Sequence, residues 1–214
     1  MNMKRRDFST ATAGLTLASI TLAPGVVWAQ VAKPVADKDY KVLDPRAPVD
    51  APAGKVEVAV FFSYMCPHCN AFEPTFTAWI KRAPKNVAIR RVPVAFLEDY
   101  EVMQRLYYAL EAMSLVEKLH AGVFAAIHGE RRKFKDAAAA ADWVAMQGVD
   151  RTKFMEQFGS FSVVSKASRA GQLTNAYKIE GVPAIGVGGR FLTDGTTKGL
   201  QTVEALVAEI AAGR

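Results

Sequence analysis

Cysteine is scarce in this chain: its 214 residues contain two, and both stand in the segment Cys66-Pro67-His68-Cys69. No second Cys or His pair follows at suitable spacing, which argues against a zinc site, because such sites usually need four ligands. His120 and His128 are the only other histidines. Eight helical residues separate them by about 12 Å, too far to share a metal ion. We expect structural or solvent-facing roles for both, and no metal or cofactor.

A long hydrophobic run is also missing. The apolar stretch from Ala11 to about Ala23 is too short for a membrane-spanning helix. It lies between a basic start, Lys4-Arg5-Arg6, and a small-residue cleavage site, Val27-Trp28-Ala29. This pattern predicts that residues 1–29 are a cleaved export signal. The mature chain would then work in an oxidising compartment in which a disulfide persists.

The export route has two interpretations. Arg5-Arg6-Asp7-Phe8 resembles the core of a twin-arginine signal, and the mild h-region suits that route. An ordinary secretory signal with two arginines by chance explains the same residues equally well. Both interpretations lead to the same compartment.

The charge is modestly basic. Loss of the signal, which carries three basic residues and one acidic residue, would lower the formal net charge from +6 to +4. The dense basic run, Arg131 to Lys135, is typical of a solvated loop before a helix. With export predicted as well, we expect no nucleic-acid partner.

The two cysteines follow a strand pattern. Val56–Phe62 is short, β-branched and aromatic, as expected of a strand buried in a sheet. Pro67 suits the first position of a helix, which we expect to continue to about Lys81. Cys66 would then lie at the helix N-terminus, where the helix dipole favours a thiolate. Cys69, three residues later, would lie nearly under it.

This arrangement predicts dithiol–disulfide exchange. Cys66 would be the attacked and attacking sulfur, and Cys69 the buried resolving one. His68, between them, can help to stabilise the Cys66 thiolate, which would make the disulfide a stronger oxidant. An inert structural disulfide is the bland alternative, but a ring this small constrains few unfolded conformations and contributes little stability.

A family resemblance rests on two motifs. Phe61 to Cys69, followed by Phe72-Glu73, resembles the active-site segment of the DsbA family of periplasmic thiol-disulfide oxidoreductases. Gly181-Val182-Pro183-Ala184 resembles the second motif of that family. The resemblance covers roughly residue 38 to the end and implies an α/β thioredoxin-like fold with an inserted helical subdomain.

The resemblance extends to single residues. It implies that Pro183 is cis and lies against the cysteine pair, so that the backbone of Val182 could pair with an extended substrate chain. Glu73 falls one helical turn after Cys69, where it is either a proton relay or a surface carboxylate. Family members commonly carry an acid six residues before the first cysteine, where this chain has Val60. Glu57 does not replace that acid, since residues three apart in a strand point to opposite faces.

The remaining pattern predicts the domain organisation. Strands are expected at Tyr40–Leu43, at Val87–Val94 and, joined by a Gly188-Gly189 turn, at Pro183–Val187 and Arg190–Leu192. Asp136 and Asp150 are expected to cap helices ending at Gly148 and Gly159, a longer helix to run from about Phe161 to Tyr177, and Thr202–Ala212 to form a closing helix. After the signal, we divide the chain into an N-terminal extension with an edge strand (30–54), a first thioredoxin-like part (55–98), a helical insertion (99–169) and a second thioredoxin-like part (170–214).

Together these features predict a monomeric periplasmic dithiol oxidase that introduces disulfides into reduced, unfolded exported proteins. By resemblance, a quinone-linked membrane oxidase of the DsbB type would regenerate it. A reductase or isomerase in the same compartment is the alternative, although no dimerisation domain is visible before Lys55. A copper-binding module using both thiolates is a third possibility.

Overall fold

The computed structural model describes residues 33–97 and 100–213. The predicted export signal therefore lies outside the described residues. In chain order the elements are β1 (Lys41–Val42), β2 (Val56–Phe62), α1 (Pro67–Ile80), β3 (Val87–Pro93), α2 (Tyr100–Ala112), α3 (Val116–His128), α4 (Ala137–Met146), α5 (Arg151–Gly159), α6 (Phe161–Ala176), β4 (Ala184–Val187), β5 (Phe191–Asp194) and α7 (Thr197–Ala211).

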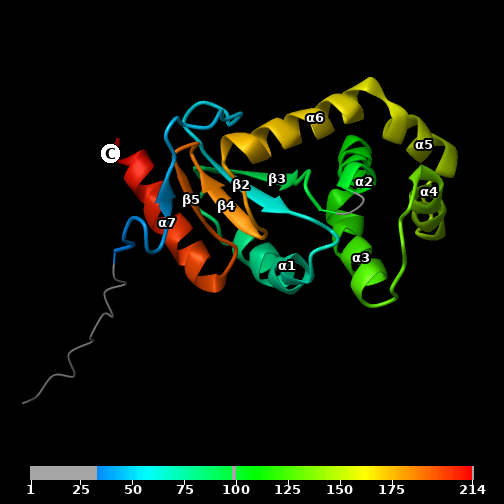
Figure 1. The fold of residues 1–214 in the computed structure, drawn as a ribbon, viewed down its shortest axis with the longest axis horizontal. Coiled ribbons are helices and arrows are strands. Elements are labelled where there is room, and N and C mark those ends of the chain that lie inside the picture. The colour runs from blue at the N-terminus through cyan, green and yellow to red at the C-terminus, as the bar shows by residue number, and fades with distance from the viewer. Residues whose placement is uncertain (1–32, 98–99, 214) are drawn as a thin grey trace, which may run out of the picture. The chain divides into compact units, whose positions relative to one another are not determined.

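A mixed five-stranded sheet forms the centre of the described part, with the strand order β1-β5-β4-β2-β3. β2 pairs in parallel with β3 and antiparallel with β4. All seven residues of β2 are buried, because helices cover both faces of the sheet, with α6 above it and α1 and α7 below it in Figure 1. This confirms the predicted mixed α/β thioredoxin-like fold.

Alternating residues of β2 belong to two different cores. Val56, Val58 and Val60 pack with α1 and α7, and Ala59 and Phe61 pack with residues of the helices on the other face. The period of two in a strand sends successive side chains to opposite faces. β2 therefore anchors both layers and leads directly into the cysteine segment.

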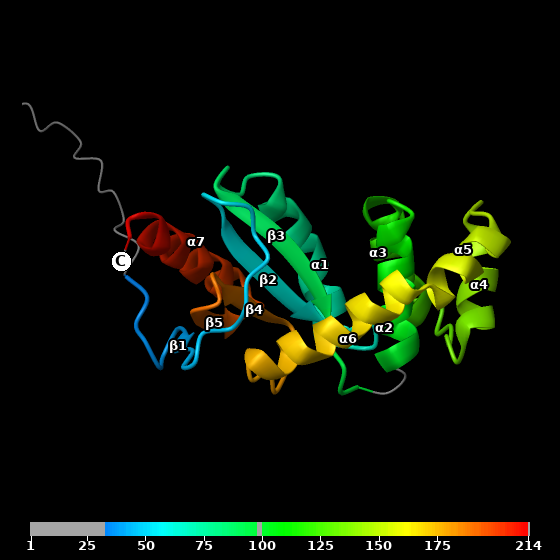
Figure 2. The ribbon, with the colours of Figure 1, turned by 90° about the horizontal axis from the view of Figure 1, so that it is seen from above.

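Helices α2 to α5 form the insertion between β3 and β4, and α6 leads back to the sheet (Figure 2). Two of the predicted caps are present: the side chain of Asp136 accepts a hydrogen bond from Ala139 N (2.8 Å), and that of Asp150 accepts one from Lys153 N (3.0 Å). The proposed domain boundary at residue 169 falls inside α6.

The closing helix differs most from expectation, because α7 begins at Thr197 rather than Thr202. Gly199 in its first turn weakens the helix signal in the sequence. Glycine is required there, since a Cβ would clash with the backbone carbonyl of Asp194. Thr196 caps the helix by accepting from Gly199 N at 2.9 Å.

The other strand limits differ slightly. β1 is shorter than the predicted Tyr40–Leu43, and β5 begins one residue later and ends two residues later than predicted. Within the residues that the structure describes, no helix is long and apolar enough to cross a membrane.

Candidate active site

The turn between β2 and α1 places the two cysteines. The Ser63 side chain accepts a hydrogen bond from Met65 N (3.1 Å), and the Ser63 carbonyl accepts one from Cys66 N (3.1 Å). Cys66 is extended, with φ −87° and ψ 117°, and occupies the N-cap of α1, with Pro67 as the first helical residue. The sequence prediction for this turn is therefore confirmed at the level of the backbone.

The two cysteines are free thiols with different surroundings. Cys66 keeps 8 % of its surface exposed, whereas Cys69 keeps 2 %. The Cys66 thiol donates a hydrogen bond to the carbonyl of Val182 at 3.4 Å. Cys66 thus lies between the helix start and the loop before β4, while Cys69 lies behind it.

Burial raises the pKa of Cys69 far above its ordinary value. A backbone hydrogen bond at Ser63 opposes this shift, whereas Cys66 and the negative charge of Glu73 add to it. Desolvation disfavours the charged form of any buried thiol. Cys69 is therefore protonated when reduced, and a group that exchanges its proton would assist each turnover.

Glu73, one helical turn after Cys69 on α1, is a candidate for that exchange. Its Oε1 accepts hydrogen bonds from Arg91 Nη2 (2.6 Å) and Thr77 Oγ1 (2.9 Å), and its Oε2 lies 3.4 Å from His120 Nε2. The side chain is 12 % exposed, so the carboxylate is held inside a set of paired groups rather than in open solvent. Burial alone would raise the pKa of Glu73, but His120 and Arg91 together lower it.

Both histidines of α3 reach Tyr64, which lies two residues before Cys66. The Tyr64 hydroxyl and His120 Nδ1 are 2.7 Å apart, and His128 Nε2 is 2.8 Å from the Tyr64 carbonyl oxygen. His120 is 4 % exposed and packs edge-on against Phe62. The sequence allowed a structural role for these histidines but gave no signal for the contact of His120 with Glu73, because the two residues belong to different subdomains.

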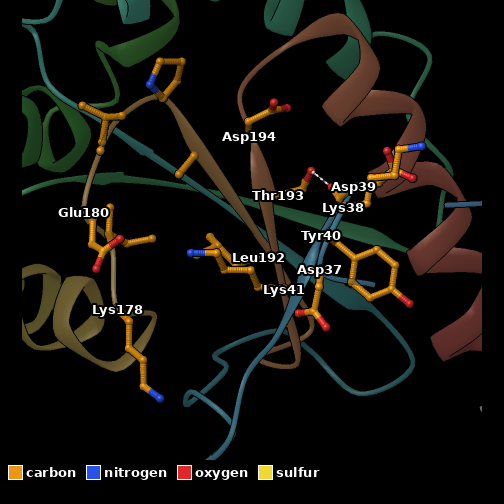
Figure 3. A pocket seen from close by; sticks show the side chains of 15 residues that line it. Asp37, Lys38, Asp39, Tyr40, Lys41, Lys178, Glu180, Leu192, Thr193 and Asp194 are labelled. Carbon is orange, nitrogen blue, oxygen red and sulfur yellow. Dashed lines mark hydrogen bonds between the residues drawn. The ribbon is translucent and has the colours of Figure 1, made fainter. Parts of the chain in front are cut away.

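The loop before β4 closes the other side of the cysteine pair. The Val182–Pro183 peptide bond is cis, as the family resemblance implies. Both residues also line a pocket of about 440 Å³ between the N-terminal segment, the loop after α6 and β5. Figure 3 shows Lys178 and Glu180 on one side of this pocket and Lys41 on the other.

The remaining predicted positions are more exposed or apolar. Pro67 and His68 are exposed, so His68 is open to solvent beside Cys66. Val60 is 3 % exposed and belongs to the core formed with α1 and α7. Glu57 points to the other face, where its Oε2 accepts a hydrogen bond from Asp50 N at 2.9 Å. It does not replace the missing acid, as the strand alternation predicts.

No cluster of three or more Cys, His, Asp or Glu residues suited to a metal ion occurs among residues 33–97 and 100–213. A thioredoxin-like sheet, a Cys-x-x-Cys pair at a helix N-terminus and a facing cis-proline loop define a thiol:disulfide oxidoreductase.

Comparison with known proteins identifies the branch: the chain belongs to the DsbA family of thiol:disulfide interchange proteins, and residues 57–211 match the DSBA-like thioredoxin domain. It is 44 % identical over 177 residues to DsbA of Burkholderia cepacia, covering 83 % of this chain and 84 % of the relative. With DsbA of Bordetella parapertussis it shares 41 % identity over 213 residues, covering 97 % and 99 %. The crystal structure of Pseudomonas aeruginosa DsbA superposes with a TM-score of 0.77 at 34 % identity, covering 82 % of this chain and 93 % of that one.

Proposed function

We propose that this chain is a periplasmic dithiol oxidase that transfers the Cys66–Cys69 disulfide to reduced, partly unfolded exported proteins. This proposal rests on the difference in exposure and surroundings between the two thiols. Cys66 is the more accessible sulfur and contacts the loop at Val182, whereas Cys69 is buried and its pKa is raised. An incoming thiolate is therefore directed to Cys66.

The reaction has two exchange steps. A substrate thiolate attacks the Cys66 sulfur. A bond forms between the substrate sulfur and Cys66, and the Cys66–Cys69 bond breaks. The electron pair goes to Cys69, which takes up a proton because its thiolate is buried. A second substrate thiolate then attacks the substrate sulfur of the mixed disulfide and releases Cys66 as a thiolate. The substrate gains one disulfide and the enzyme two electrons.

Cys66 is suited to be the sulfur that leaves in the second step. It lies at the N-cap of α1, where the free backbone N–H groups and the dipole of the helix favour negative charge. A stabilised thiolate favours the reduced enzyme and makes its disulfide a stronger oxidant. The exposed imidazole of His68 adds a second group that can interact with this thiolate.

Substrate binding is assigned to the backbone next to Pro183. An extended substrate chain can pair with the main chain of Val182, whose carbonyl oxygen lies 3.4 Å from the Cys66 sulfur. The adjoining pocket contains both lysines and carboxylates, among them Lys41, Lys178 and Glu180. Mixed charges of this kind fit a substrate defined by its backbone and thiol rather than by one side-chain sequence.

The cellular setting follows from the predicted signal and the family. Residues 1–29 would direct export to the periplasm, and a DsbB-like membrane quinone oxidoreductase would reoxidise the thiols. Named relatives such as that of Bordetella parapertussis are thiol:disulfide interchange proteins, which supports this assignment. A monomer suffices, since both cysteines and the facing loop belong to one chain.

The direct test uses the oxidised mature protein and a reduced model peptide with two cysteines. We expect one peptide disulfide to form for each Cys66–Cys69 disulfide consumed, as followed by mass spectrometry. A Cys66→Ser variant that still oxidised the peptide would contradict the proposal. Preferential reduction of an oxidised peptide by the dithiol form would instead identify a reductase.

A further inference from the structure

Four side chains from four parts of the fold meet around Glu73 and His120, and Glu73 lies one helical turn after Cys69. Glu73 comes from α1, Arg91 from β3, His120 from α3, and Tyr64 from the turn before Cys66. The side chains of Arg91, Glu73 and His120 are 10 %, 12 % and 5 % exposed. Buried ionisable groups are costly unless they are paired, so their assembly one helical turn from a buried thiol calls for a chemical explanation.

The hydrogen bonds leave one side of Glu73 facing His120. Arg91 and Thr77 both donate to Oε1, while Oε2 lies 3.4 Å from His120 Nε2. His120 Nε2 is buried and makes no aligned hydrogen bond. At its other nitrogen, Nδ1, the ring meets the Tyr64 hydroxyl at 2.7 Å. When that hydroxyl donates to Nδ1, the ring proton is on Nε2 and is presented to Glu73.

A small cavity connects this pair with the surface. Its volume is about 80 Å³, and its lining includes Glu73, Arg91, His120 and Glu117. The Glu117 side chain is 91 % exposed, so the cavity opens toward solvent. It is large enough for water, and the ionisable side chains of Glu73, Arg91 and Glu117 contribute to its lining. Glu73 therefore has access to protons that does not pass through Cys66.

Resting on the function proposed above, we propose that His120 is a positioning residue: it holds Glu73 ionised and oriented so that Glu73 can exchange a proton with the Cys69 thiol. Val60 stands where the family commonly has an acid for this step, and His120 with Glu73 takes over that task from a different direction. In the oxidising direction the Glu73 carboxylate first takes up a proton from the cavity and then passes it to the Cys69 sulfur as the disulfide breaks. In the reverse direction the Cys69 sulfur loses that proton before it attacks.

The charges around His120 agree with this role. Burial lowers its pKa, Glu73 opposes this effect, Arg91 adds to it, and the exposed Glu117 on its own helix opposes it. The rings of Tyr64 and Tyr107 also pack against the imidazole. The ring is thus neutral near pH 7 and acts as a hydrogen-bond donor. It stabilises the Glu73 carboxylate without placing a second full positive charge beside Arg91.

The test separates the Cys69 step from the Cys66 step. Reduced mature protein is mixed with oxidised glutathione, which forms a mixed disulfide with Cys66 and releases one glutathione. Cys69 then attacks Cys66, closes the protein disulfide and releases the second glutathione. At low glutathione the second-order rate reports Cys66, and at saturating glutathione the plateau rate reports Cys69.

We expect His120→Phe to lower the plateau rate about tenfold, less than the hundredfold or more that a general base itself contributes. The second-order rate should stay unchanged, and the plateau rate should rise continuously with pH, because hydroxide then replaces Glu73. His120→Gln keeps a donor and should recover most of the plateau rate. His128→Gln serves as the matched control on the same helix, because His128 contacts Tyr64 but not Glu73.

A plateau rate and pH profile of His120→Phe equal to those of the wild type would overturn the proposal. Equal losses in His120→Phe and His120→Gln, with an unchanged pH profile, would assign His120 a purely structural role and also overturn it. If His120→Phe does not fold, Tyr64→Phe removes the hydroxyl that orients the ring, and an unchanged plateau pH profile there overturns the proposal too. A wild-type protein that does not react with glutathione at all would instead contradict the proposed function.

Discussion

The two sides of the cysteine pair differ in origin and in chemistry. On the outer side, Cys66 meets the Val182 carbonyl and exposed residues of the thioredoxin-like part. On the inner side, burial and the negative charge of Glu73 raise the pKa of Cys69, Glu73 pairs with Arg91, and α3 of the helical insertion contributes His120. The thioredoxin-like part thus presents the reactive sulfur of Cys66, while the insertion helps to control the proton on Cys69.

Removing each sulfur in turn should have the largest effect and should show that the two sides of the pair are not equivalent. Cys66→Ser should reduce oxidation of a dithiol peptide to the uncatalysed background, because the attacked sulfur is gone. Cys69→Ser cannot form the internal disulfide, but its Cys66 should still form a stable mixed disulfide with an oxidised peptide. Mass spectrometry of the trapped adducts checks both outcomes. If Cys69 in the Cys66→Ser variant formed a stable adduct as fast as Cys66 does in the Cys69→Ser variant, the two sides of the cysteine pair would be equivalent.

Replacing Glu73 should affect the inner side alone. We expect Glu73→Gln to slow the attack by Cys69 on a Cys66–glutathione disulfide by up to about a hundredfold, the scale of general acid–base catalysis. The reaction of Cys66 with oxidised glutathione should change little. Stopped-flow measurements at saturating and limiting glutathione distinguish the two steps. Equal slowing of both would mean that Glu73 supports the structure of the whole site.

Acid should destabilise the folded reduced protein through the inner side. Burial lowers the pKa of His120, so below about pH 6.5, the ordinary value for histidine, the unfolded chain binds more protons and stability falls. The lowered pKa of Glu73 adds stability that is present above its unfolded pKa and is lost as the pH falls through the folded value. Each extra proton bound by the unfolded state gives a slope of about 1.4 kcal/mol per pH unit.

Urea denaturation between pH 7.5 and 5 checks this dependence. His120→Gln should flatten the curve near pH 6, while His128→Gln should leave that part of it parallel to the wild type. A wild-type stability that does not change over this range would contradict the assignment of His120 as a buried neutral ring.

His68 tests the outer side with the smallest expected effect. His68→Ala should make the disulfide less oxidising by some tens of millivolts, where about 30 mV corresponds to a tenfold change in the equilibrium constant. The rate of the Cys69 step should stay the same, because His68 is exposed beside Cys66. Glutathione equilibration with the variant gives the potential. An unchanged potential would show that His68 does not stabilise the Cys66 thiolate.

The sequence predicted what depends on local pattern. The buried strand Val56–Phe62, the helix start at Pro67 and the caps at Asp136 and Asp150 each depend on neighbouring residues. The position of Glu73 near Cys69 also follows from helical spacing. The contact of His120 with Glu73 does not, because it depends on how the insertion packs against the sheet. The early start of α7 was missed because Gly199 is chosen for its close approach to Asp194 rather than for helix propensity.

The reduction potential of the Cys66–Cys69 pair in the mature protein tests the central claim most directly. Equilibration with glutathione buffers should give a value near the oxidising end, around the −120 mV known for DsbA, a published reference value rather than one calculated from this geometry. That result would show a disulfide ready to be donated. A value near the −270 mV of thioredoxin would contradict the account and make the chain a reductant.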